Sequence, residues 1–246
     1  MDVRILHFYP DLMNLYGSYA NAAVLKRCLE SLGCTVSVSA VKPGEDVRLR
    51  DVDFLCMGAG TERSAEFAAG DMQRYREELS AAANDGAVML FAGTAMELLG
   101  QSVTSADGHT FPGAGLAGFR SVQDRKRRVG DVYGHTDLYP EAVVGFMNKC
   151  AVIRGVETPL LSKLDMGWGN EAPNGPEGFH WKNVFASELT GPLLVKNPKL
   201  LETVAAAVYA RRGLPLPVDH PSGGWPEKAY AVTEEQLRLR AQGKQR

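Results

Sequence analysis

The sequence predicts an α/β fold built on an open, mostly parallel sheet with helices on its faces. Over the first hundred residues, apolar and amphipathic stretches alternate in the order β-α-β-β-α-β-α, which is typical of a doubly wound sheet. Two strand-like stretches, 52–57 and 87–91, are apolar apart from Asp53, as parallel strands covered on both faces are. After Gly100 glycine and proline become frequent and the segments shorten, which indicates an antiparallel extension in the second half.

The elements of the first half follow from periodicity and from turn residues. We expect strands at 3–9, 35–41, 52–57 and 87–91. We expect helices from Ser18, a candidate cap, to about Leu32, and again at 71–84 and 95–99. A flexible loop at 58–61 follows the third strand, at the carboxyl edge of the sheet where ligands bind in such folds.

The second half reads as shorter pieces packed against the sheet. Strand-like stretches lie at 115–121, 129–135 and 142–146, and a final strand is expected at 181–189. A helix at 198–212 precedes a proline-rich segment that carries Pro215, Pro217, Pro221 and Pro226, and a short charged helix is expected at 233–242. We therefore expect one domain over residues 1–213 and a surface tail over 214–246.

Composition excludes several classes of function. The chain has 246 residues and a net charge of −2, which gives no electrostatic case for nucleic-acid binding. No apolar run approaches the roughly 20 residues that span a bilayer, and the first residues lack a signal-peptide pattern. The four cysteines and five histidines have no metal-ligand spacing. We expect a cytoplasmic protein without a metal or cofactor.

The stretch Gly86–Gly100 has the pattern of a nucleophile-bearing turn. A buried strand ends in a sharp turn at Ala92-Gly93-Thr94, and a helix opens directly after it. This arrangement exposes a nucleophile above the sheet and favours a developing anion at the helix N-terminus. Gly93, however, stands where a cysteine or serine is needed.

Six stretches, taken in chain order, resemble the GatD family within the CobB/CobQ type of class I glutamine amidotransferase. They are Met13-Asn14-Leu15-Tyr16-Gly17, the loop 58–63, the turn at 92–94, Gly145-Phe146-Met147-Asn148, Gly167-Trp168-Gly169-Asn170, and Asn183 followed by Gly191-Pro192-Leu193-Leu194-Val195-Lys196-Asn197-Pro198. The resemblance covers about residues 3–213. It implies an amidotransferase fold and a glutaminase subunit that works with a MurT-like Mur ligase to amidate the lipid II stem peptide.

The chain departs from that family at both catalytic positions. The family motif Cys-Gly-Gly-Tyr-Gln-x-Leu-Gly aligns with residues 93–100, so Gly93 replaces the nucleophile. The family motif Tyr-Leu-His-Gly-Pro aligns with residues 188–192, so Thr190 replaces the base. Hydrolysis by this route needs a thiolate and a base that holds its proton. We expect no glutamine hydrolysis.

The resemblance also implies a substrate-binding set, although each member has a plainer interpretation. The loop 58–60 matches the family's oxyanion loop and could equally be an ordinary strand-to-helix turn; the basic residues 125–128 could equally form a solvated loop. The substrate-binding residues implied by the resemblance are Gly58, Ala59, Gly60, Thr94, Glu97, Arg128 and Asn148.

Three functions remain open at this point. The first is a GatD-like subunit that has lost hydrolysis and retains binding of a MurT-like ligase. The second is a repurposed small-ligand-binding or scaffold module of the same family. The third is an amidotransferase with a relocated nucleophile, for which Cys150 is the best-placed thiol and Cys56 a weaker one.

Overall fold

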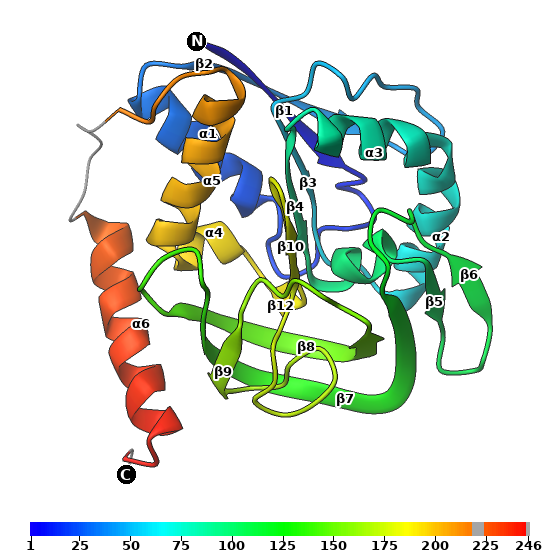
Figure 1. Ribbon diagram of the computed structural model, residues 1–246, viewed down its shortest axis with the longest axis vertical. Coiled ribbons are helices and arrows are strands. Elements are labelled where there is room, and N and C mark those ends of the chain that lie inside the picture. The colour runs from blue at the N-terminus through cyan, green and yellow to red at the C-terminus, as the bar shows by residue number, and fades with distance from the viewer. Residues whose placement is uncertain (218–223, 245–246) are drawn as a thin grey trace.

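The computed structural model describes residues 1–217 and 224–244, and its centre is a mostly parallel sheet (Figure 1). The strand order is β10-β11-β4-β3-β1-β2, and every neighbouring pair is parallel except β10 with β11. The strands are β1 (Asp2–Phe8), β2 (Thr35–Val41), β3 (Phe54–Met57), β4 (Val88–Ala92), β10 (Phe179–Trp181) and β11 (Val184–Ser187). The predicted fold class is confirmed.

Helices cover both faces of this sheet (Figure 1). On one face lie α1 (Ala20–Ser31), α4 (Leu193–Lys196) and α5 (Pro198–Arg211); on the other lie α2 (Glu62–Met72), the 3-10 turn η1 (Gln73–Tyr75) and α3 (Arg76–Asn84). Within β3, Phe54 and Cys56 pack with α1 and α5, whereas Leu55 and Met57 pack with α2 and α3. Burial on both faces explains why this strand is apolar throughout.

A second sheet follows the first and has the order β12-β8-β7-β5-β6, with β9 also paired to β7. Its strands are β5 (Ser102–Thr104), β6 (Thr110–Pro112), β7 (Arg120–His135), β8 (Val143–Arg154), β9 (Lys163–Met166) and β12 (Leu189–Thr190). The strands β7 and β8 form one long antiparallel pair whose register shifts between Gln123 and Arg128. The predicted strand pieces at 129–135 and 142–146 are parts of this pair. They were expected to be shorter because the charged residues 124–128 interrupt the alternation of apolar residues.

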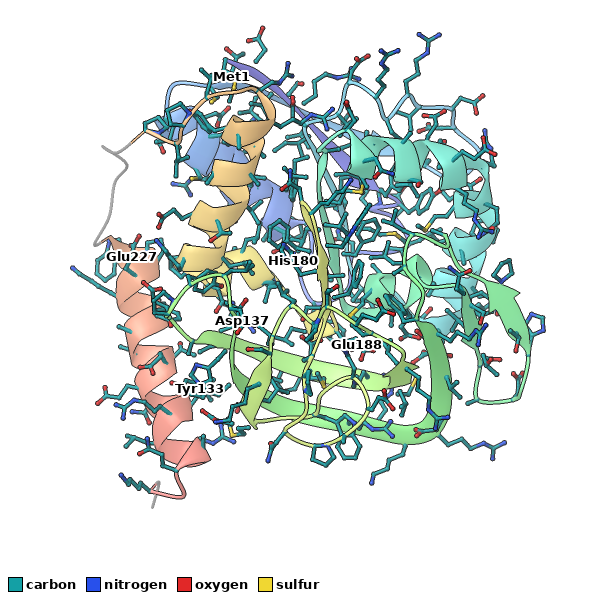
Figure 2. All side chains as sticks on the ribbon, in the orientation of Figure 1. Met1, Tyr133, Asp137, His180, Glu188 and Glu227 are labelled. Carbon is teal, nitrogen blue, oxygen red and sulfur yellow. The ribbon has the colours of Figure 1, made fainter. Side chains whose placement is uncertain are left out.

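The last helix, α6 (Trp225–Ala241), lies beside the second sheet (Figure 1). Leu237 packs with Tyr133 and Val144, and the Tyr133 hydroxyl donates to Glu234 at 2.7 Å (Figure 2). The helix begins eight residues before the predicted start at 233. Pro221 of the predicted proline-rich segment lies outside the described residues. None of the described helices is long and apolar enough to cross a membrane.

Further local predictions differ from the structure. Of the strand expected at 115–121, only 120–121 lie in a strand, the start of β7. The helix α2 begins directly after the loop 58–61, where Thr61 caps it by accepting from the Ser64 amide at 3.1 Å; we had expected no helix before 71. Ser18 does not cap α1, because its hydroxyl donates to the Leu15 carbonyl instead. The final strand predicted at 181–189 is divided into the hairpin β10–β11 and the short strand β12.

Asn197 connects β8 of the second sheet to α4, one of the helices that cover the first sheet. Its side-chain oxygen accepts from the Val144 amide at 2.8 Å, and its nitrogen donates to the carbonyls of Val144 and Leu193, each at 2.9 Å. The residue is buried between β8 and the start of α5. The motif that carries the most specific resemblance therefore has a structural role in this chain.

Candidate functional site

The turn after β4 has the backbone of a nucleophile elbow but has no room for a side chain. Gly93 has φ of +64°, in the left-handed region, and opens the 3-10 helix η2 (Gly93–Leu99). A Cβ atom placed on Gly93 would lie 2.6 Å from the Cβ of Ala59. Atoms at that separation overlap, so a cysteine at this position would require Ala59 to move.

The loop that resembles an oxyanion site already has partners for two of its amides. The Ala59 amide donates to the Ser18 hydroxyl at 3.2 Å. The Gly60 amide donates to the Thr94 hydroxyl at 2.8 Å, and that hydroxyl donates back to the Gly60 carbonyl at 3.1 Å. Stabilisation of an oxyanion requires amides aimed at the developing charge. These two amides are aimed at the protein itself.

Close backbone packing accounts for both glycines of this loop. A Cβ on Gly58 would lie 2.1 Å from the Ser18 Cβ, and one on Gly60 would lie 2.3 Å from the Met13 sulfur. The loop also forms an isolated bridge between Ala59 and Leu15. Glycines at 58 and 60 are therefore needed for the fold, whether or not the loop binds a ligand.

Thr190, at the position of the family's histidine, lies in β12 beside β8. Its hydroxyl donates to the Phe146 carbonyl at 3.1 Å, and the two residues are paired in the sheet. The side chain is buried. A threonine hydroxyl in this position is bonded to the backbone and has no basic nitrogen with which to accept a proton from a nucleophile.

Four buried charged residues come together here: Glu97, which belongs to the predicted substrate-binding set, and Glu177, Glu188 and Lys149. They are here called the buried charged cluster, and the sequence did not reveal that they meet. Each is 2% exposed or less. Lys149 forms an ion pair with Glu188 and donates to the Gly169 carbonyl at 2.8 Å. Glu188 lies between the two sheets (Figure 2). Three carboxylates therefore share one buried lysine.

Burial and mutual repulsion raise the pKa values of these carboxyl groups. Burial, followed by the charge of Glu188, raises the pKa of Glu97 to about 8. Burial raises the pKa of Glu177 to about 7, and it raises that of Glu188 despite the attraction of Lys149. Glu97 accepts from the Gln123 amide at 2.8 Å through one oxygen, while its other oxygen has no partner among the described residues. Glu97 is therefore mainly protonated at neutral pH.

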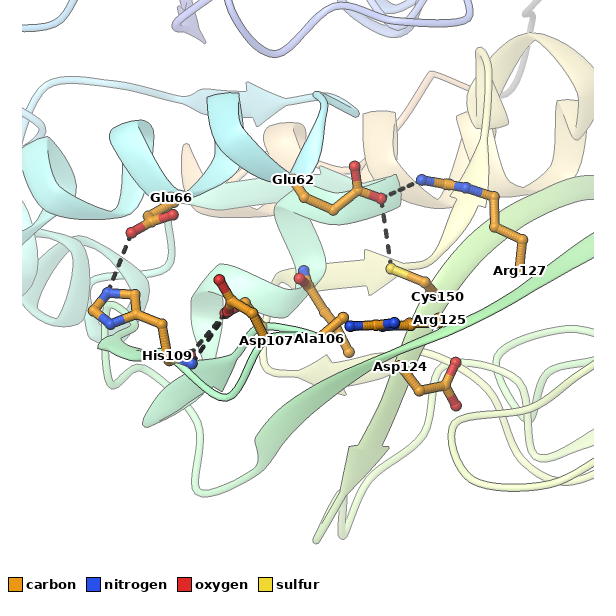
Figure 3. A pocket seen from close by; sticks show the side chains of 11 residues that line it. Glu62, Glu66, Ala106, Asp107, His109, Asp124, Arg125, Arg127 and Cys150 are labelled. Carbon is orange, nitrogen blue, oxygen red and sulfur yellow. Dashed lines mark hydrogen bonds and ion pairs between the residues drawn. The ribbon is translucent and has the colours of Figure 1, made fainter.

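A cavity of about 620 Å³ opens beside this cluster (Figure 3). Its wall includes Glu62 of α2, Cys150 of β8 and Gln123 of β7. Arg127 forms an ion pair with Glu62 across it. Gln123 connects the cavity wall to Glu97 through the hydrogen bond given above. Neither Gly93 nor Thr190 lines this cavity.

Neither thiol considered as a relocated nucleophile is activated. The Cys150 sulfur lies 3.5 Å from a Glu62 oxygen, and burial together with the charges of Glu97 and Glu62 raises its pKa to about 12. Burial raises the pKa of Cys56, in the core strand β3, to about 12 as well. A nucleophilic cysteine needs a low pKa and a cationic neighbour such as imidazolium. His109 lines the same cavity as Cys150 and its ring pairs with Glu66 at 3.2 Å, but among the described residues no hydrogen bond joins His109 to the Cys150 sulfur.

The two remaining residues of the predicted substrate set are held by contacts within the chain. Arg128 donates to both oxygens of Asp124, at 3.1 and 2.7 Å, and to the Cys150 carbonyl at 3.2 Å. Asn148 bonds the Tyr16 hydroxyl at 2.8 Å and Arg127 at 3.1 Å. Their role in binding a substrate stays a prediction.

The structure brings some of the predicted residues together and leaves others apart. Ala59 and Gly60 meet Gly93 and Thr94 at the elbow, through the contacts described above. Thr190 and Asn148 lie on the strands β12 and β8 of the second sheet. Sequence reasoning missed Glu177 entirely, although a carboxylate within the glycine-rich segment before the strand at 181–189 was a visible signal. No group of three potential metal ligands occurs within residues 1–217 and 224–244.

Comparisons with known proteins agree with this geometry. Among solved structures, PurLQS from Thermotoga maritima matches 86% of this chain and 97% of its own chain, with a TM-score of 0.51 and 15% identity. A structure described as a glutamine amidotransferase matches 82% of this chain and 98% of its own, with a TM-score of 0.51 and 13% identity. The architecture is thus that of class I glutamine amidotransferases.

Comparison with known sequences assigns the chain to one family within this class. Residues 4–198 match the model of the CobB/CobQ-like glutamine amidotransferase domain, and the chain belongs to that family. The lipid II isoglutaminyl synthase (glutamine-hydrolyzing) subunit GatD of Streptococcus pneumoniae is 32% identical over 80% of this chain and 77% of its own length. The subunit of the same name from Staphylococcus aureus is 26% identical over 87% of this chain and 88% of its own length.

Proposed function

We propose that this chain is a GatD-like subunit that does not hydrolyse glutamine and that serves a MurT-like ligase in amidation of the lipid II stem peptide. The two curated relatives, both named as subunits of lipid II isoglutaminyl synthase, support the assignment to this complex. The observation that carries the inactivity is the elbow: Gly93 offers no nucleophile, and Ala59 occupies the space that one would need.

Two further features support the loss of hydrolysis. Thr190 supplies no base, and the amides of Ala59 and Gly60 are bonded within the protein. Loss of a nucleophile and base that act as a unit removes several orders of magnitude in rate, and what remains comes from oxyanion stabilisation and substrate binding. Here the residual oxyanion contribution is reduced too.

The ligase of such a complex must obtain ammonia from another source. We expect a purified complex of this chain with a MurT-like ligase to amidate the stem peptide when ammonium is supplied. With glutamine as the only nitrogen source, we expect amidation to be at least 100-fold slower. Product formation, measured by mass spectrometry, checks this expectation.

The GatD subunit of Staphylococcus aureus with its own ligase is the positive control, because its name states glutamine hydrolysis. Equal rates with glutamine and ammonium would contradict the inactivity. Absence of any complex would contradict the assignment as a subunit.

We place this complex in a reducing compartment such as the cytoplasm, since all four cysteines are free.

A second candidate is a small-ligand-binding module, and the cavity of Figure 3 favours it. The cavity contains Arg125, for which the described residues offer no ion pair, beside several carboxylates. A ligand that binds only the folded state raises the melting temperature. A thermal-shift titration with amino acids, glutamine included, separates this module from a subunit that binds protein alone.

A further inference from the structure

The strand β2 forms a free edge of the first sheet. All seven of its residues pair with β1 in unbroken parallel register, from Thr35 with Asp2 to Val41 with Phe8. On its other side, no strand among the residues that the structure describes is paired with it. A free strand edge presents unpaired N–H and C=O groups to which another strand can add. The edge of β2 is therefore a surface that can accept a strand.

The edge of β2 lacks the features that usually protect free edges. Soluble proteins keep such edges short or place charges, prolines or bulges on them. The strand β2 has the sequence Thr-Val-Ser-Val-Ser-Ala-Val and a continuous register, so it has none of these features. The strands at the other ends of the two sheets, β10, β6 and β12, have three residues or fewer, and β6 includes Pro112. Val38 is 46% exposed and Ala40 is exposed too, so the described chain leaves the middle of β2 open.

The backbone of β2 directs alternate residues toward β1 and away from it. The Val41 carbonyl accepts from the Tyr9 amide at 2.8 Å, on the side of β1. The backbone groups of the odd-numbered residues therefore face β1, because this direction alternates along a strand. The N–H and C=O groups of Val36, Val38 and Ala40 face outward. These three residues form the hydrogen-bonding surface of the edge.

The sequence of β2 is nearly symmetrical about Val38. In an antiparallel pair with a second copy, centred on a two-fold axis at Val38, this residue faces its own counterpart. Ser37 then faces Ser39 of the second copy, and Val36 faces Ala40. No like charges oppose each other, as they would if a charged edge paired with itself. Each outward-facing residue meets an outward-facing residue and exchanges two hydrogen bonds with it.

The side chains of such a pair continue the apolar layer of the sheet. Val36 belongs to the buried cluster that includes Leu25 and Leu29 of α1. Val38 and Ala40 lie on the same face of β2 as Val36, because side chains alternate along a strand. Two copies of Val38 that meet at the axis would remove this exposed apolar surface from water.

We propose that β2 is a dimerisation edge, through which two copies of this chain pair in antiparallel register about Val38. The partner is a second copy because the strand is complementary to itself in register and in its lack of charge. A two-fold pair is closed, since each copy uses the same edge, whereas a head-to-tail contact can propagate. The inference does not depend on the proposed function, because the contact lies on a lateral edge of the sheet and not at the elbow after β4.

Sedimentation equilibrium of the purified full-length chain tests the pairing. The wild type should form a dimer whose fraction rises with concentration. Val38→Lys places two like charges at the axis and should weaken the dimer at least tenfold. Val122→Lys is the matched control: Val122 is a 38% exposed valine of β7 that is paired on both sides, and its replacement should change the dissociation constant less than twofold. Circular dichroism and melting temperature show whether each variant is folded.

Cysteine cross-linking tests the register. Val38→Cys places two thiols at the axis, where opposite Cα atoms lie about 5.5 Å apart, within reach of a disulfide. Mild oxidation should therefore convert this variant to a covalent dimer. Ala40→Cys is the control on the same face: its two copies lie four residues apart along the paired strands, about 13 Å, and should not cross-link. The oxidised wild type shows any cross-linking by the four native cysteines.

The remaining outcomes overturn the proposal. A chain that stays monomeric at every concentration has no dimerisation edge. A dimer that Val38→Lys leaves intact, or that Val122→Lys weakens as much, forms through another surface. Equal cross-linking of Val38→Cys and Ala40→Cys contradicts the antiparallel register. If the chain is monomeric and Val38→Lys weakens its binding to the ligase, the edge accepts a strand of that partner and not a second copy.

Discussion

At the scale of single residues, the elbow and the buried charged cluster show two different consequences of substitution. Gly93 removes a reacting group without disturbing the backbone that once positioned it, since glycine adopts the left-handed conformation without strain. Glu97 instead adds an acidic group where the family motif has glutamine, and it is buried within reach of the charge of Glu188. The glycine supplies no nucleophile, and the glutamate is expected to change how stability depends on pH.

The raised pKa of Glu97 predicts that the folded state loses stability as pH rises. Below about 4.5 the group is protonated in both states; between there and about 8 the unfolded chain releases its proton while the folded chain retains it. Stability contributed by Glu97 therefore falls by up to about 1.4 kcal/mol per pH unit across this window. Glu97→Gln should stabilise the protein by about 2 kcal/mol or more at pH 8 and change it little at pH 5.

Urea denaturation of wild type and Glu97→Gln at the two pH values measures this difference. Glu157→Gln is the control, because Glu157 is exposed and its replacement should have no effect at either pH. The same gain for Glu97→Gln at pH 5 and pH 8 would show that packing, and not ionisation, determines the effect. Glu177 contributes to the remaining pH dependence in the same direction, since its pKa is also raised.

At the scale of elements, the elbow after β4 and the loop 58–60 pack against each other through Gly93 and Ala59. Gly93→Ala adds only a Cβ, and that atom would overlap the Cβ of Ala59 at 2.6 Å. We expect a loss of about 2–3 kcal/mol, from overlap and from the cost of an alanine at positive φ. In the background Ala59→Gly the same substitution should cost about 1–2 kcal/mol less, because the overlap with the Cβ at 59 is removed and only the backbone cost and a 3.2 Å contact with the Cα at 59 remain.

A double-mutant cycle on the free energy of unfolding measures this coupling. Gly70→Ala is a suitable control, since a Cβ on Gly70 of α2 would meet nothing within 4 Å. If the effects of Gly93→Ala and Ala59→Gly add without coupling, the two elements are not in the contact described. Strong coupling means that Gly93→Cys with Thr190→His restores activity only after Ala59→Gly is added.

The sequence predicted the parallel strands well, because uniformly apolar runs and glycine turns identify β3 and β4 directly. The sequence did not predict α2. The buried face of this helix is short and consists mainly of alanines, including Ala65, Ala68 and Ala69, so its apolar pattern is weak. The predicted strand at 129–135 was also shorter than β7, because the charged residues 124–128 hide the alternation of apolar and polar residues that is typical of a strand. The positions of the lost nucleophile and base were readable from motifs, but the contact of Ala59 with Gly93 required coordinates.

At the scale of the whole molecule, the chain has the framework of the amidotransferase fold, and we propose that it does not carry out the hydrolysis. Asn197 connects β8 of the second sheet to α4, and Arg212 holds the end of α5 to Asp53, directly before β3, at 2.7 and 2.8 Å. We propose that residues 1–213 form the amidotransferase domain and that 214–246 are an appended tail. Retention of such joints is expected if selection acts on docking to a partner.

The buried charged cluster could not be predicted from the sequence, because its residues come from different elements. Glu97, Glu188 and Lys149 come from η2, the segment before β12, and β8, and only the fold brings them within reach of one another. The spacing of these three residues in the sequence therefore does not predict that their side chains interact. The substrate-binding roles of Arg128 and Asn148 stay predictions, and the partners that these residues have within the chain could not be foreseen from the sequence.

The central claim is that this chain does not hydrolyse glutamine, and the release of ammonia from glutamine by the purified protein tests it most directly. Ammonia is measured with glutamate dehydrogenase, for the chain alone and with its ligase, beside the Staphylococcus aureus subunit as a positive control. The account predicts no release above the uncatalysed background in either state. Turnover that persists in a highly purified sample and disappears in Cys150→Ser would contradict it.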